Sequence, residues 1–104
     1  MRETHESTFT VPPGHPSLPG HFPGGPIVPG VVLLDEVFRA ARAAFGLGPV
    51  AQVIRSKFVT PVLPGRMVFL RLTRIGDARL AFECSVDGAP ALSGEAEFAA
   101  TEPR

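Results

Sequence analysis

The 104-residue sequence contains no tryptophan, no tyrosine and only one cysteine, Cys84. One cysteine cannot form a disulfide within the chain, which excludes a disulfide-stapled scaffold and fits a reducing compartment. The ten basic and ten acidic residues cancel, so no net charge attracts the chain to nucleic acid. No apolar run approaches the roughly 20 residues of a membrane span, and the first residues lack a signal-peptide core. These absences predict a cytoplasmic protein without a nucleic-acid partner or a membrane span.

The apolar content is high for so small a chain. Hydrophobic residues make up 44% of the sequence, and eight residues are phenylalanine. A single domain of this size buries only a modest fraction of its surface by itself. We therefore expect one domain over residues 1–104, with about residues 1–6 frayed, and with either a buried oligomer interface or a tunnel for an acyl chain.

Proline and glycine are concentrated in one segment of the chain. Seven prolines and five glycines lie between Pro12 and Gly30, and this density excludes a helix and an interior strand. Apolar residues such as Leu18, Phe22 and Ile27 are spaced through the segment. This mixture favours an ordered loop that packs on the protein.

Two periodicities divide the rest of the chain. Residues 31–45 lack proline and glycine and end before Gly46, which predicts a helix of about four turns. Strands with a period of two are predicted over residues 50–58, 66–75, 79–86 and about 92–98, with a short first strand over residues 7–11. Gly76-Asp77 and Asp87-Gly88 are typical of hairpin turns. The pattern predicts an α+β fold in which a curved antiparallel sheet, ending in a four-stranded meander, wraps around one central helix.

His21 and Asp35 are the first candidates for chemistry. His21 lies in the stiff loop, and Asp35 lies in the first turns of the predicted helix. Imidazole suits a base near neutral pH, and burial of a carboxyl group favours the protonated form that an acid needs. Gly30 lets a backbone N–H at the helix start approach developing negative charge. Simpler interpretations stay open, because His21 also fits an ordinary loop position and Asp35 also fits an ion pair with Arg39.

The segment Gly20-His-Phe-Pro-Gly-Gly-Pro-Ile-Val-Pro-Gly-Val, followed by Asp35, resembles the active-site segment of the beta-hydroxyacyl-(acyl carrier protein) dehydratases. These are hot-dog-fold enzymes. The segment from Lys57 to Gly65, where a strand ends in a Pro-x-x-Pro-Gly turn, resembles a second family segment. The opening Gly14-His-Pro-Ser-Leu-Pro-Gly and the short length resemble the small dehydratases of aryl polyene-type pathways. The resemblance covers about residues 14–98.

The resemblance implies a hot-dog fold and a homodimer, or a higher oligomer, in which His21 of one subunit faces Asp35 of the other. It implies that His21 removes the α-proton of a 3-hydroxyacyl thioester and that Asp35 helps the hydroxyl leave as water. The Gly30 N–H would polarise the thioester carbonyl. The implied partner is an acyl carrier protein or an acyl thioester substrate, and no cofactor or metal takes part. The expected contacts to the substrate are Phe22, Pro29, Val31, Leu34 and Phe38.

The chain departs from the family pattern beside the acid. Family members often carry alanine after the acid and glutamine four residues beyond it, where this chain has Glu36 and Arg39. Charge is also unevenly distributed, since residues 50–82 are mainly basic and residues 83–104 mainly acidic. Solvated strand faces account for this asymmetry. The functional interpretation is a surface that docks an acidic carrier protein through Arg55, Lys57 and Arg66.

The leading hypothesis is dehydration of 3-hydroxyacyl thioesters to trans-2-enoyl thioesters, in fatty acid or polyketide-like biosynthesis. A hot-dog acyl thioesterase is the first alternative. It needs a carboxylate that activates water and dispenses with a loop histidine, so the pairing of His21 with Asp35 argues against it. A non-catalytic acyl-binding hot-dog subunit, or one half of a heterodimeric enzyme, is the second alternative.

Overall fold

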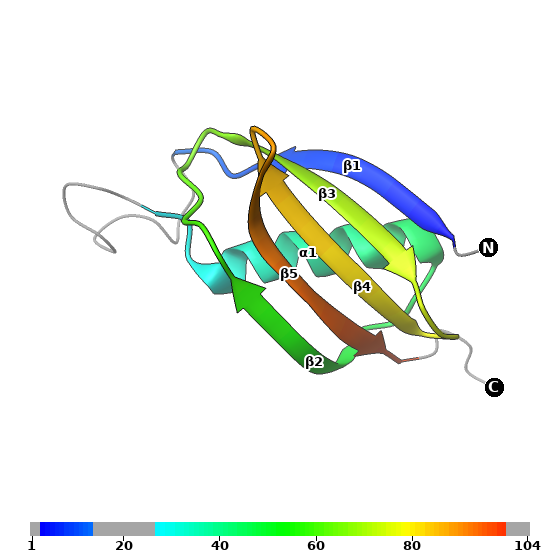
Figure 1. Ribbon diagram of the computed structural model, residues 1–104. Helices are drawn as coiled ribbons and strands as arrows, with labels where there is room; N and C mark the ends of the chain where they lie inside the picture. The colour runs from blue at the N-terminus through cyan, green and yellow to red at the C-terminus, as the bar shows by residue number, and fades with distance from the viewer. Residues whose placement is uncertain (1–2, 14–26, 100–104) are drawn as a thin grey trace.

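The computed structural model describes residues 3–13 and 27–99. Its elements follow in the order β1 (Thr4–Thr10), α1 (Gly30–Phe45), β2 (Val50–Phe58), β3 (Met67–Arg74), β4 (Arg79–Val86) and β5 (Ala89–Phe98). The strands form one antiparallel sheet in the order β1-β3-β4-β5-β2. The sheet curves around α1, which crosses one of its faces (Figure 1). The expected α+β fold, a curved sheet around a long helix, is confirmed.

The core lies between α1 and the inner face of the sheet. Val68, Leu70 and Leu72 of β3 are fully buried, whereas the intervening Phe69 and Arg71 are exposed. This is the expected alternation of a strand with one face on a core. The other strands and one face of α1 complete the core with Leu80, Phe82, Cys84, Leu92, Ala96, Phe98, Val32, Leu33, Val37 and Ala41.

The turns predicted from glycine are also present. Gly46 ends α1 in the left-handed conformation, with φ of 65°, and its N–H donates to the carbonyl oxygen of Arg42. Asp87 and Gly88 have φ values of 52° and 82° and join β4 to β5. Two consecutive positive φ values define the tight turn that matches the twist of a hairpin. The sequence therefore predicts the end of the helix and the last hairpin correctly.

Two expectations about the strands are wrong. The strand β1 begins at Thr4, and residues 4–6 pair with residues 71–73 of β3, so this part of the chain is not frayed. The strand β2 does not continue into a meander with β3. It pairs with β5, with Val50 opposite Phe98 and Phe58 opposite Leu92. A period of two identifies a strand and its buried face, but it does not identify the neighbouring strand.

The strand β2 lies at the edge of the described sheet and is largely exposed. Its register against β5 shifts twice, between Val50 and Gln52 and between Val53 and Arg55. Val53 is 40% exposed and Phe58 is 50% exposed. A long edge strand with exposed apolar side chains is a surface on which another strand can pair. Within the described residues, no helix is long and apolar enough to cross a membrane.

The junction between β2 and β5 depends on Gly94. A β-carbon at this position would lie 2.2 Å from the carbonyl oxygen of Arg55 and 2.6 Å from Cζ of Phe82. Backbone on one side and a core ring on the other leave no room for a methyl group. The close approach of β2 to β5 therefore requires glycine at position 94.

We expect Gly94→Ala to lower the free energy of unfolding by about 3 kcal/mol, at the upper end of overpacking effects. Gly76→Ala is the matched control, because its β-carbon would meet only Cβ of Arg79, at 3.4 Å. The control is expected to change stability by roughly 0.5 kcal/mol or less. Urea unfolding followed by far-UV circular dichroism measures both variants. Equal unfolding midpoints for the two would contradict the packing at β2.

Candidate active site

The first turn of α1 presents backbone N–H groups at the edge of the sheet. Pro29 precedes the helix in an extended conformation, and its carbonyl oxygen accepts from the N–H groups of Val32 and Leu33 at 3.0 and 3.3 Å. The helix itself offers no acceptor to the N–H groups of Gly30 and Val31. These two donors lie at the positive end of the helix dipole, where negative charge is stabilised.

An apolar cavity of about 520 Å³ lies at this end of α1. Three segments enclose it, namely the chain leading into the helix, the first turns of α1, and the end of β2 with the loop after it. A hydrogen bond of 2.8 Å from the N–H of Val28 to the carbonyl oxygen of Val62 joins two of these segments. The cavity is lined by Ile27, Val28, Pro29, Gly30, Leu33, Phe58, Val59, Thr60, Pro61 and Val62. Among these, only Thr60 has a polar side chain.

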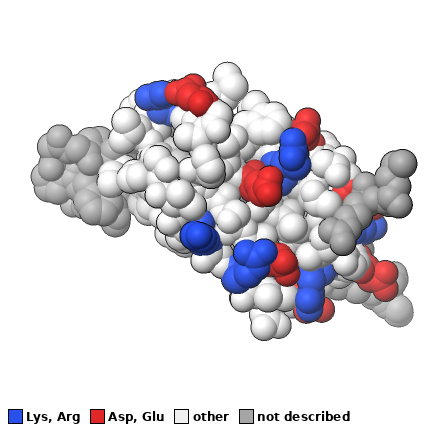
Figure 2. Space-filling model, viewed as in Figure 1, with Lys and Arg blue, Asp and Glu red and all other residues white. Residues whose placement is uncertain are grey.

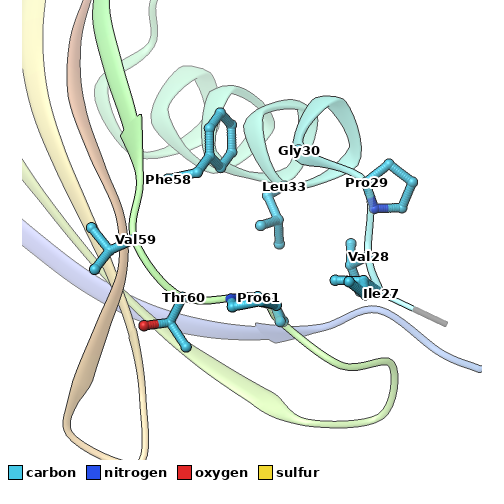
Figure 3. A pocket seen from close by; sticks show the side chains of 10 residues that line it. Ile27, Val28, Pro29, Gly30, Leu33, Phe58, Val59, Thr60 and Pro61 are labelled. Carbon is cyan, nitrogen blue, oxygen red and sulfur yellow. The ribbon is translucent and has the colours of Figure 1, made fainter. Parts of the chain in front are cut away.

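Gly30 and Phe58 meet at one end of this cavity. A β-carbon at position 30 would lie 2.7 Å from Cζ and 2.9 Å from Cε1 of Phe58. The tip of the phenyl ring therefore rests on the glycine backbone. Figure 3 shows this ring beside the start of α1, with Thr60 and Pro61 at the opposite end of the cavity. The cavity thus brings the helix N-terminus and an apolar chamber together.

Asp35 lies outside this cavity. It borders an open groove of about 700 Å³ that is lined by Asp35, Phe38, Arg39, Arg42, Ala43, Leu47 and Val50. Five residues separate it from Gly30, which turns its side chain roughly 140° around the helix axis. Its carboxylate oxygen is 3.8 Å from a guanidinium nitrogen of Arg39. Within one chain, Asp35 therefore forms the simple ion pair with Arg39 and does not meet Gly30.

The expected burial of Asp35 against neighbouring apolar residues is wrong for the single chain. The side chain of Asp35 is 74% exposed, and Val31, one turn earlier on the same side of α1, is 72% exposed. Leu34 and Phe38 are half-buried and pack on the core. The ring of Phe38 makes edge-to-face contacts with Phe82 and Phe98, each with 5.9 Å between centroids. Among residues 3–13 and 27–99, nothing covers the carboxylate, because its side of the helix faces away from the sheet.

The other predicted site residues are distributed as follows. Pro29 and Gly30 line the apolar cavity. His21 and Phe22 lie outside the described residues. The wall formed by Phe58 and the loop up to Val62 was not predicted as part of the site. The Pro-x-x-Pro-Gly segment was the available signal, because a rigid loop after a strand fixes the chain that borders a cavity.

The three candidate docking residues do not form one basic area. Arg55 pairs with Glu95 at 3.1 Å, and Arg66 pairs with Asp87. Lys57 has no ion pair within residues 3–13 and 27–99. Figure 2 shows basic and acidic side chains mostly side by side across the outer face of the sheet. Most of the basic charge on this face is therefore neutralised locally.

The remaining reactive groups offer no alternative centre in the described part of the chain. Cys84 is buried in the core, and burial raises the pKa of its thiol to about 12. A thiol that stays protonated at neutral pH is a poor nucleophile. Among residues 3–13 and 27–99, no three His, Cys, Asp or Glu side chains lie together as a metal site requires.

The sequence profile of the ApeI-like family, described as ApeI dehydratase, matches residues 1–95. The chain belongs to the ApeI-like dehydratase family. It is also 33% identical, over 88% of its length and 73% of the relative's, to the 3-hydroxyacyl-(acyl-carrier-protein) dehydratase FabZ of Ruminiclostridium cellulolyticum. The FabZ of Thermus thermophilus is 32% identical, over 80% of this chain and 68% of the relative.

Solved structures share the fold of this ApeI-like chain. An uncharacterised protein from Erwinia carotovora superposes with a TM-score of 0.83, at 30% identity, over 96% of this chain and 86% of that one. The dehydratase heterocomplex ApeI:P from Xenorhabdus doucetiae gives a TM-score of 0.79, at 25% identity, over 95% and 94%. The fluoroacetyl-CoA thioesterase FlK gives 0.68 at 19% identity, over 94% and 84%, a likeness of fold alone. The expected hot-dog fold is confirmed.

The contact between Gly30 and Phe58 predicts that substitutions at the two positions have non-additive effects on the free energy of unfolding. Gly30→Ala in the wild-type chain is expected to cost about 1–3 kcal/mol, because its methyl group collides with the ring of Phe58. In a Phe58→Leu background the same change is expected to be neutral or stabilising by up to about 1 kcal/mol, because alanine is the better helix former. Thermal or urea unfolding of the four proteins measures the coupling. Additive effects would contradict the contact.

Proposed function

We propose that this chain dehydrates 3-hydroxyacyl thioesters to trans-2-enoyl thioesters, with the acyl group carried on acyl carrier protein, in fatty acid or polyketide-like biosynthesis. The observation that carries the proposal is the helix N-terminus at Gly30, whose free N–H borders an apolar cavity. The loop that carries His21 leads directly into this helix. The FabZ relatives are 3-hydroxyacyl-(acyl-carrier-protein) dehydratases, which supports the same reaction class.

The reaction needs three groups. His21 takes the proton from C2, and the electron pair of that C–H bond forms the C2=C3 double bond. Negative charge that develops on the thioester oxygen is stabilised by the N–H of Gly30, which is aimed by the helix and needs no reorganisation. Asp35 gives a proton to the hydroxyl on C3, so that the C3–O bond breaks and water leaves. The proton taken by His21 and the proton given by Asp35 balance over one turnover.

The geometry of one chain supports a site shared between two subunits. Gly30 and Asp35 lie in different pockets of the same helix, so a single chain does not place oxyanion donor and acid around one substrate. The exposed edge strand β2 ends at Phe58, on the wall of the cavity. Two chains that pair through this strand about a two-fold axis have self-complementary surfaces. We infer that each subunit supplies its Asp35 to the cavity of the other, and that the receiving subunit covers this acid from water.

The first experiment follows enoyl formation by absorbance with a 3-hydroxyacyl-carrier substrate. The wild-type protein is expected to form product, and His21→Ala and Asp35→Asn are each expected to lose about 10²–10⁴-fold in kcat, the usual contribution of general acid–base catalysis. Release of free thiol without enoyl product would instead indicate a thioesterase. Binding of the acyl carrier without any turnover would indicate a non-catalytic subunit.

Mixing the two inactive variants tests whether the site is shared. Co-expressed His21→Ala and Asp35→Asn chains are expected to recover about one quarter of wild-type activity, because half of the dimers are mixed and each mixed dimer has one complete site. Two copies of the same variant recover nothing and serve as controls. A mixture that stays inactive while forming dimers would place both residues in the same subunit's site.

Carrier docking is expected to depend on Lys57 more than on Arg55 or Arg66, because the two arginines are already paired. Lys57→Glu should raise the KM for a carrier-bound substrate about tenfold, at the low end of electrostatic steering effects, and leave a short pantetheine thioester unchanged. Arg79→Glu is the matched control, because Arg79 lies on the same face of the sheet but is the first residue of β4, whereas Lys57 lies near the end of β2. If Lys57→Glu raises the KM equally for both substrates, Lys57 does not take part in carrier docking.

A further inference from the structure

We propose that Phe58 excludes substituents at C2 of the acyl group and so restricts this chain to unbranched 3-hydroxyacyl thioesters. The inference rests on the proposed function for the position of the thioester carbonyl at Gly30. It adds a residue that determines specificity and that stands on a different element from the proposed catalytic groups. Phe58 is the last residue of β2, whereas Gly30 and Asp35 lie on α1.

The position of the ring carries the argument. Three ring atoms, Cζ, Cε1 and Cε2, would lie 2.7, 2.9 and 3.3 Å from a β-carbon on Gly30. A carbonyl that accepts from the N–H of Gly30 must therefore approach along the tip of this ring. The carbon next to that carbonyl is C2, which is where a branching methyl group would meet Phe58. The far end of the acyl chain would extend toward Thr60 and Pro61, away from the ring (Figure 3).

The fold does not need this ring for its core. Phe58 is 50% exposed, whereas Phe82 and Phe98 are buried and hold Phe38 between them. Phe58 is the last residue of β2, and it pairs with Leu92 of β5, which is itself buried. A large apolar side chain that borders a cavity and stays half-exposed is available for contact with a substrate. Its truncation changes the shape of the cavity more than the packing of the core.

Gly30 and Phe58 divide the same space between them. Any side chain at position 30 would collide with the ring of Phe58, so the ring limits the space beside the backbone of Gly30. Thr60 is the one lining side chain that could make a hydrogen bond, and it stands at the opposite end. Near the carbonyl, substrates are therefore selected by their shape, and the ring of Phe58 is the group that excludes a branched acyl chain.

The test compares 3-hydroxybutanoyl and 2-methyl-3-hydroxybutanoyl pantetheine thioesters, which both keep a proton on C2. The wild-type chain is expected to prefer the unbranched substrate by about 10–200-fold in kcat/KM, the range for one methyl group in a hydrophobic site. Phe58→Leu and Phe58→Ala are expected to reduce this ratio at least about tenfold. Phe69→Ala is the matched control, since Phe69 is 40% exposed on the outer face of the sheet and should leave the ratio unchanged.

A binding measurement separates this inference from the proposed function. The amide analogues of butanoyl and 2-methylbutanoyl pantetheine have no hydroxyl to lose and no thioester to hydrolyse, so calorimetry reports their affinity whichever reaction the chain catalyses. Tighter binding of the unbranched ligand by the wild-type chain, and a smaller difference in Phe58→Leu, supports the role of Phe58 even if no enoyl product forms. Equal affinities in the wild-type chain, or an unchanged ratio in both Phe58 variants, would overturn it. If the Phe58 variants lose kcat/KM for both substrates by the same factor, Phe58 acts in subunit contact and not in specificity.

Discussion

The packing of α1 into the concave side of the sheet is the constraint from which the site follows. Val37 and Ala41 have almost no exposed surface, and they lie against strands whose inward side chains are equally covered. A helix held so closely cannot turn about its axis without exposing these residues. The direction of every other side chain on α1 is then fixed. The backbone of Gly30 lies at the end of β2, and the side chain of Asp35 points away from the sheet.

This division gives the chain two incomplete half-sites instead of one complete site. One half combines an apolar chamber with the positive end of a helix dipole. The other half is an acid on an open groove, with an arginine 3.8 Å away and no cover from the described part of its own chain. The edge strand β2 borders the first half and leaves its outer backbone edge without a neighbour in the described sheet. In the proposed function, a second copy of the chain supplies the complement to each half.

Patterns of local physical origin could be predicted from the sequence, and contacts between distant segments could not. The alternation of Val68, Leu70 and Leu72 predicts the buried face of β3, and Asp87-Gly88 predicts the tight turn between β4 and β5, because each depends on neighbouring residues only. The pairing of β2 with β5 depends on the long-range approach at Gly94, which no local pattern encodes. Phe58 was missed for the same reason. Its role depends on Gly30, which is distant in sequence, and its identity as phenylalanine does not indicate that partner.

The buried thiol of Cys84 has a consequence for how this fold can be observed. The chain has no tryptophan or tyrosine, so intrinsic fluorescence carries almost no signal from the interior. Cys84 lies on β4, is buried in the core and is protonated at neutral pH. A thiol reagent can reach it only when strands and helix separate. The rate of its modification therefore measures the opening of the core, and a chain without tryptophan or tyrosine fluorescence carries a chemical reporter among its buried residues.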